Sequence, residues 1–100
     1  MSAAKGSTRE KTSDKVKEPK QYEVVMHNDD FTTMEFVVGI LTDIFHKDRI
    51  TAETLMLDVH NKGSAVVGKY AYDIAVTRTN KAMTRAKESG FPFKMTIREA

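Results

Sequence analysis

The sequence contains no cysteine and no long run of apolar residues. Without cysteine, disulfide bonds and thiolate zinc sites are excluded, which fits a reducing compartment. The longest apolar run, residues 36–41, includes a glycine and is far shorter than the ~20 residues that a membrane-spanning helix needs. The first residues also lack the apolar stretch of a secretory signal. We therefore expect a cytoplasmic protein that does not associate with a membrane.

The sequence also lacks the short motifs that mark most enzymes. It has no Gly-x-Ser-x-Gly nucleophile elbow and no glycine-rich phosphate loop. The histidines His27, His46 and His60 show neither i, i+4 spacing nor a His-Glu-x-x-His arrangement, so a metal site would need distant carboxylates such as Asp29 or Asp30. We expect no enzymatic activity, no cofactor and no metal.

The positive charge of the chain lies in its first twenty residues. These carry six Lys or Arg against three Asp or Glu, whereas residues 21–100 carry ten basic and eleven acidic side chains. The basic segment favours one alternative, a small ribosome- or RNA-associated α+β domain with a basic tail. The nearly neutral remainder has no stripe of aromatic and basic residues, which argues against nucleic-acid binding.

The chain divides near Pro19. Residues 1–19 are rich in Ser, Thr, Lys and Glu and contain no aromatic residue, a composition that cannot bury enough apolar surface to fold. We interpret residues 1–19 as a disordered extension. With 40% hydrophobic residues in one hundred, residues 20–100 are enough for one small domain with a single core, which we expect to be monomeric.

Alternating and helical patterns predict the elements of this domain. Tyr22, Val24 and Met26 alternate with other residues as in a strand. A helix over residues 33–45 should follow, with Thr32 as N-cap and Glu35 closing a capping box. Its apolar stripe has helical spacing and consists of Val37, Ile40, Leu41 and Ile44.

The residue pattern in the second half of the sequence predicts two more helices and two more strands. Thr51 is a reasonable N-cap for a helix that ends at Gly63, where a left-handed cap belongs. Residues 65–67 resemble a short strand, and Gly68 marks a bulge or a close approach. The longest helix should cover residues 71–89, and a final strand contains Phe93, Met95 and Ile97. In the longest helix, the expected inward residues are Ile74, Ala75, Ala82, Met83 and Ala86.

The order strand-helix-helix-strand-helix-strand predicts an α+β fold. Three strands with one apolar face need a cover, and three helices can provide it. We expect a two-layer sandwich in which the helices pack on a small, three-stranded antiparallel sheet.

Asn28, Asp29 and Asp30 follow directly after the first apolar strand and form the most informative segment. Two adjacent carboxylates repel each other, and a cationic ligand would relieve that repulsion. The simpler alternative is a polar loop in which Asn28 or Asp29 makes an Asx turn. If the backbone stays extended, Asn28 and Asp30 face one side and Asp29 the other.

A second feature is a pair of apolar faces on the first two helices. Met34 and Val37 on one helix, and Met56 and Val59 on the other, are each spaced by three and so are neighbours on a helix surface. Such residues are often plain core packing, but methionine also suits surfaces that accept several apolar side chains. His60 follows this face directly, and spacing alone does not decide its role.

Together these segments resemble the ClpS family. The resemblance covers about residues 21–100. It rests on residues 28–32, residues 34–38, the pairs at 56–57 and 59–60, and Gly63, which occur in the family's order and separations. ClpS proteins are adaptors that deliver substrates with a large hydrophobic N-terminal residue, called N-degrons, to a Clp-family AAA+ unfoldase and its protease.

The resemblance implies roles for particular residues. Asn28, Asp30 and His60 would bind the free α-amino group of the substrate, with Asp29 close by. The first side chain of the substrate would enter a hydrophobic pocket, and Met34 would gate it against β-branched residues. The residues of this implied pocket are Met26, Thr32, Met34, Val37, Met56, Val59 and Phe93.

The resemblance also implies partners. The N-terminal domain of a ClpA- or ClpC-like unfoldase would bind the longest helix, where Asp73, Thr77 and Arg78 are the candidate contacts. An ordinary solvated helix face is the alternative. The N-terminal extension would be a handle that the unfoldase engages during substrate transfer, or else an inert linker.

Four positions depart from the family pattern. Thr33 stands where proline is common, Val67 where cysteine is frequent, and Phe31 where tyrosine is usual. His27 replaces an aliphatic residue, which would change the pocket wall and with it the preferred side chain. None of these departures removes an amine-binding residue.

Overall fold

The computed structural model describes residues 19–100, so the predicted extension lies outside the described residues except for Pro19. The described chain folds into three strands and three helices in the predicted order. This order confirms the α+β class. The elements are β2 (Tyr22–His27), α1 (Met34–Asp43), α2 (Arg49–Lys62), β3 (Ser64–Tyr70), α3 (Tyr72–Glu88) and β4 (Lys94–Glu99).

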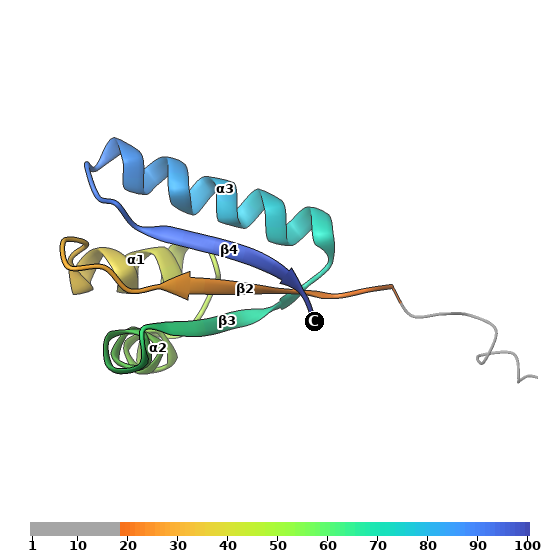
Figure 1. The fold of residues 1–100 in the computed structure, drawn as a ribbon, viewed down its shortest axis with the longest axis horizontal. Helices are drawn as coiled ribbons and strands as arrows, with labels where there is room; N and C mark the ends of the chain where they lie inside the picture. Colours follow the sequence, from red (N-terminus) through yellow and green to blue (C-terminus); the bar gives the residue numbers. More distant parts are fainter. Residues whose placement is uncertain (1–18) are drawn as a thin grey trace, which may run out of the picture.

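The strands form one antiparallel sheet in the order β3-β2-β4, with β2 in the centre. In Figure 1, α3 lies along β4, whereas α2 lies beside β3, and α1 packs against α2. The loop from β2 to α1 is at one end of the sheet, and the C-terminus is at the other (Figure 1). Within residues 19–100, no helix is both long and apolar enough to cross a membrane.

The core lies between the helices and one face of the sheet. Alternation on β2 places Val24 and Met26 on this face, and both are completely buried. The predicted stripe of α1 packs against them, because Val37, Ile40, Leu41 and Ile44 are all buried in the same cluster. Val25 is also buried but lies outside this cluster, consistent with the opposite face of the sheet.

Gly68 lies at an irregularity between β2 and β3. Val24 pairs with Gly68 whereas Val25 pairs with Val66, so one extra residue, Val67, is inserted in β3. A Cβ on Gly68 would lie 2.7 Å from the Tyr70 hydroxyl oxygen. The predicted bulge and the predicted close approach at Gly68 therefore both occur, and β3 is longer than the predicted strand.

Two predicted N-caps are wrong. Helix α1 is capped by Thr33, whose Oγ1 accepts a hydrogen bond from the Phe36 amide at 3.1 Å, because Thr32 is bound to the preceding loop. Helix α2 begins earlier than predicted and is capped by Asp48, whose Oδ1 accepts from the Thr51 amide at 2.8 Å. At each helix start, a residue other than the predicted one has its side-chain oxygen in position to accept from a free amide of the first turn.

The inward face of α3 was predicted only in part. Ala75, Ala82 and Ala86 are buried as expected, but Ile74 and Met83 are 41% and 38% exposed. Helix α3 instead turns Thr79 inward, because its close packing on the sheet is made by small side chains. The prediction favoured large apolar residues and missed this preference.

Candidate functional site

The loop between β2 and α1 is fixed at both of its ends. At its start, the Asn28 amide donates a hydrogen bond to the Gly63 carbonyl at 2.9 Å. Gly63 adopts the predicted left-handed conformation that ends α2, with φ of 91°. This contact brings the end of β2 next to the last turn of α2, although the two are far apart in the sequence.

Asp29 holds the rest of the loop. Its Oδ1 accepts from the amides of Phe31 and Thr32 at 2.8 and 2.7 Å, and its Oδ2 accepts from the Thr32 hydroxyl at 2.7 Å. Partial burial raises the pKa of this carboxyl, but the hydrogen bonds from Thr32 and Phe31 outweigh it and hold the pKa below its ordinary value. The Asx turn considered from the sequence is therefore present, and it uses Asp29.

A cavity of about 220 Å³ opens beside this loop. It lies between the loop, the first turns of α1 and the last turns of α2. A cavity of about 150 Å³ lined by apolar side chains is enough to hold benzene, so this one has room for a large apolar side chain. The residues that line it are Asn28, Asp29, Asp30, Thr32, Met34, Val37, Met56, Val59 and His60.

The cavity has a polar side and an apolar side. Asn28 and Asp30 are exposed at the end of β2, and His60 is exposed on α2. On the apolar side, Val37 and Val59 are buried. Such an arrangement suits a ligand with a polar group attached directly to an apolar one.

The polar side favours a positively charged group. His60 belongs to the last turn of α2, where the carbonyl groups at the end of a helix carry partial negative charge. The carboxylate of Asp30 and the side-chain oxygen of Asn28 supply further acceptors. Since Asp29 is committed to the loop, Asp30 is the carboxylate that is left to meet a cation.

Three residues predicted to affect the pocket wall do not line the cavity. Met26 is completely buried and Phe93 is 5% exposed, and both belong to the core behind it. The His27 Nε2 atom lies 2.7 Å from the Thr96 hydroxyl on the neighbouring strand. His27 therefore does not change the pocket wall, contrary to what the sequence suggested.

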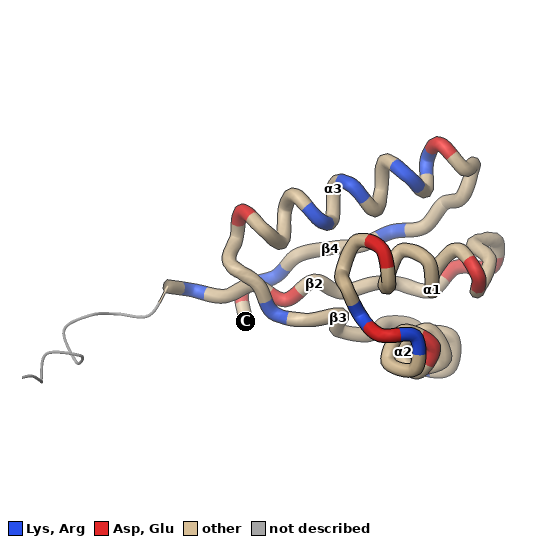
Figure 2. Tube along the Cα trace, turned by 180° about the vertical axis from the view of Figure 1, so that it is seen from behind, with Lys and Arg blue, Asp and Glu red and all other residues tan. Residues whose placement is uncertain are grey.

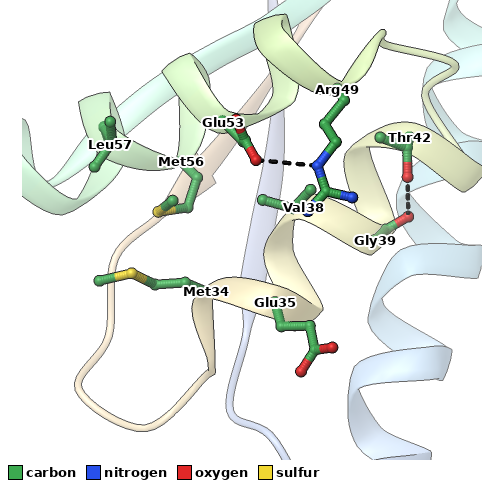
Figure 3. Close-up of a pocket in the computed structure, with 9 residues that line it drawn as sticks. All are labelled: Met34, Glu35, Val38, Gly39, Thr42, Arg49, Glu53, Met56 and Leu57. Atoms are coloured by element: carbon green, nitrogen blue, oxygen red, sulfur yellow. Dashed lines mark hydrogen bonds and ion pairs between the residues drawn. The ribbon is translucent and has the colours of Figure 1, made fainter.

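A larger groove of about 610 Å³ adjoins the cavity between α1 and α2. Met34 and Met56 line both hollows, and in Figure 3 their side chains reach toward each other from facing helices. Farther along the groove, Arg49 pairs with Glu53 at 3.1 Å (Figure 3). The sequence did not predict the groove, although Leu57, an apolar residue that is 49% exposed in it, follows Met56 directly.

Across residues 19–100, no three His, Cys, Asp or Glu side chains gather closely enough to hold a metal ion. His27, His46 and His60 lie on separate elements or loops.

Comparisons with known proteins agree with this geometry. Residues 17–96 match the family model described as ATP-dependent Clp protease adaptor protein ClpS. A ClpS from Clostridium acetobutylicum is 44% identical over 89 residues, covering 89% of this chain and 88% of the relative. A ClpS from Oleidesulfovibrio alaskensis is 43% identical and covers 99% of both chains.

A solved structure gives a similar fold. It is Agrobacterium tumefaciens ClpS2 bound to L-phenylalaninamide, with 38% sequence identity and a TM-score of 0.80, and the match covers 83% of this chain and all of that chain. The resemblance noted in the sequence is thereby confirmed, and family membership decides against the RNA-associated alternative. The chain belongs to the ClpS family, the non-catalytic adaptor proteins of the ATP-dependent Clp protease.

Proposed function

We propose that this adaptor recognises proteins through a free N-terminal amino group and a large hydrophobic first side chain. The observation that carries the proposal is the single cavity that joins Asn28, Asp30 and His60 to an apolar wall. L-phenylalaninamide, the ligand of the related ClpS2, has a free amine next to an aromatic side chain. It is therefore a chemical model of the proposed ligand.

The amine would bind at the polar side. A free α-amino group is largely protonated at neutral pH and needs several acceptors. Asp30 supplies the negative charge, while Asn28 and one ring nitrogen of neutral His60 supply further acceptors. Asp29 acts indirectly. Its three hydrogen bonds fix the conformation of the loop and so orient the adjacent Asn28 and Asp30.

The first side chain would enter between α1 and α2, against Met34, Val37, Met56 and Val59, with Thr32 at the rim. Burying a Leu or Phe side chain contributes about 1.5–3 kcal/mol. This is too little for tight binding alone, so the amine contacts must add to it. Tight binding therefore requires both the free amine and the large apolar side chain of the ligand.

Fluorescence anisotropy with a labelled peptide that begins with Phe tests the proposal, with its N-acetylated twin as control. We expect saturable binding of the free amine only, because acetylation removes the charge and donors. His60→Ala should weaken binding by about 5- to 150-fold, equivalent to about 1–3 kcal/mol. His46→Ala, which changes an exposed histidine outside the cavity, is the matched control. Wild-type affinity in folded His60→Ala would contradict the role of His60.

The partner of the adaptor would be the N-terminal domain of a ClpA- or ClpC-like unfoldase, bound to α3. Asp73 and Thr77 are exposed on this helix, and the Arg78 guanidinium lies 5.2 Å from the centre of the Tyr70 ring. Figure 2 shows basic residues along α3 between an acidic residue near each end. Charge reversal at Asp73 should weaken unfoldase binding in calorimetry while peptide binding persists, whereas the same change at Glu88 serves as control.

The N-terminal extension would serve in substrate transfer. Residues 1–18 lie outside the described part of the chain, but residue 19 enters the fold at the end of the sheet opposite the β2–α1 loop (Figure 1). Deleting residues 1–18 should therefore leave peptide binding unchanged and abolish degradation of an N-degron substrate by the reconstituted protease. Normal degradation would identify the extension as an inert linker.

A further inference from the structure

We propose that Met34 and Met56 form an oxidation site through which peroxide lowers the affinity of the adaptor for its substrates. The inference rests on the proposed function, because it concerns the same cavity. Its starting point is the sulfur chemistry of the chain. Since the sequence has no cysteine, its six methionines carry all of its sulfur atoms.

The fold divides the described methionines into two groups. Met26 is completely buried and Met95 is 3% exposed, so both are shielded in the core. Met34 is 51% exposed and Met83 is 38% exposed, and Met56 is half-buried. Oxidation follows exposure, so an oxidant reaches the second group while the core stays reduced.

The two accessible methionines on α1 and α2 lie in the same region of the molecule. Met34 and Met56 line both the candidate cavity and the adjoining groove. Their thioether ends lie at the same end of that groove, reached from two facing helices (Figure 3). Solvent in the groove therefore has access to the two methionine side chains of the apolar wall.

The chemistry is a balanced two-electron transfer. A lone pair on the Met34 or Met56 sulfur attacks one oxygen of hydrogen peroxide, which forms the S–O bond and breaks the O–O bond. The proton on the transferred oxygen passes to the departing hydroxide, which leaves as water. The sulfur is oxidised by two electrons, the peroxide is reduced by two, and the product is methionine sulfoxide.

The sulfoxide changes the cavity where an apolar side chain would sit. An S=O group is a strong hydrogen-bond acceptor, and a substrate side chain such as Phe or Leu offers it no donor. Binding would then bury an unpaired polar oxygen. We expect the affinity for a peptide beginning with Phe to fall about tenfold or more, with the fold intact because the core methionines are shielded.

Peroxide treatment of the full chain tests the inference. Mass spectrometry of peptides gives the sulfoxide fraction at each methionine, and anisotropy gives the affinity for the Phe peptide at each time point. We expect affinity to fall in step with sulfoxide at Met34 and Met56, before Met26 and Met95 react. Unchanged affinity after full oxidation of Met34 and Met56 would overturn the inference.

Two variants separate the site from general damage. Met34→Leu/Met56→Leu keeps an apolar wall that cannot be oxidised, so its affinity before and after peroxide should agree, whatever its starting value. Met83→Leu removes an exposed methionine outside the cavity and should lose affinity on oxidation as the wild type does. If the double variant loses as much affinity on oxidation as the wild type, the loss comes from oxidation of another residue.

The same experiment distinguishes the two proposals. If the untreated chain binds no peptide with a free N-terminal Leu, Phe, Tyr or Trp, the proposed function fails, and the oxidation proposal fails with it. If untreated chain binds and fully oxidised chain binds equally well, only the oxidation proposal fails.

Discussion

Two adjacent carboxylates at the β2–α1 corner have different tasks. Asp29 accepts three hydrogen bonds from residues just after it, and its lowered pKa reflects them. Asp30 is exposed at the cavity and makes no hydrogen bond with another described residue. Asp29 therefore shapes the loop, and Asp30 is left exposed for the proposed ligand.

This division can be measured with a pair of variants. Asp29→Ala should lower the free energy of unfolding by about 1–2 kcal/mol, because the Phe31 and Thr32 donors lose their acceptor. Asp30→Ala should leave stability almost unchanged and weaken peptide binding. Urea denaturation and peptide anisotropy of both variants check this. Equal stability losses in the two variants would contradict the division.

Met34 is the proposed gate that selects which side chains enter the cavity. It begins α1 and is half exposed at the mouth of the cavity, so Met34→Ala should widen the entrance with little loss of stability. We expect the wild type to reject peptides that begin with Ile or Val and the variant to bind them. Anisotropy with Leu, Ile and Val peptides measures the change, and continued rejection of both β-branched peptides would refute it.

At the scale of elements, the ends of the helices position the site. The left-handed turn at Gly63 ends α2 beside His60, and the Gly63 carbonyl holds the Asn28 amide. Thr33 starts α1 directly after the loop that Asp29 fixes. The cavity is thus built where the end of one helix, the start of another and the end of the central strand meet.

Two glycines should respond to alanine in opposite directions. Gly63→Ala should lower the free energy of unfolding by about 1 kcal/mol, because an L side chain is strained at φ of 91°. Gly39 lies within α1, where the nearest atom to an added Cβ is Arg85 Nη2 at 3.9 Å, an ordinary contact. Gly39→Ala should therefore stabilise the protein by about 0.5–1 kcal/mol.

Urea denaturation of the two alanine variants at one pH is sufficient for the comparison. A stability loss in Gly39→Ala would mean that the Arg85 side chain does not accommodate the methyl group. No loss in Gly63→Ala would mean that the end of α2 relaxes without strain.

At the scale of the whole molecule, acid should weaken the fold through three aspartates. The hydrogen bond and charge of Arg85 lower the pKa of Asp43 despite some burial, and Thr51 hydrogen bonds lower that of Asp48. Asp29 behaves similarly through Thr32 and Phe31. Because each folded pKa is below its ordinary value of 3.8, the stabilisation is fully present above 3.8 and lost as the pH falls through the folded values.

Asp43 offers a direct test, since it joins α1 to α3 through a 2.7 Å contact with Arg85. Asp43→Asn should be less stable than the wild type at neutral pH. The difference should shrink as the pH falls below 3.8 and through the folded pKa of Asp43, because the wild-type carboxylate then becomes protonated as well. Urea denaturation across this range measures both curves, and a constant difference would rule out ionisation of Asp43 as its cause.

The element order, the fold class and all nine residues that line the cavity were predictable from the sequence. Alternating and helical spacing reflects burial on one face, which is a local signal along the chain. Residues 28–32 and 34–38 were recognisable because family motifs are also local. Gly63 was predictable for the same reason, since only a residue that tolerates a left-handed backbone ends a helix in this way.

The surroundings of the cap residues and of the predicted pocket residues depend on the tertiary structure. The caps are Thr33 and Asp48 rather than Thr32 and Thr51, because Asp29 binds the amide and hydroxyl of Thr32 and because α2 begins before Thr51. Met26 and Phe93 went into the core, and Met34 and Met56 remained accessible, because packing between distant elements sets exposure. Periodicity identifies a face of a strand or helix, but only the assembled fold determines whether protein, solvent or a ligand covers it.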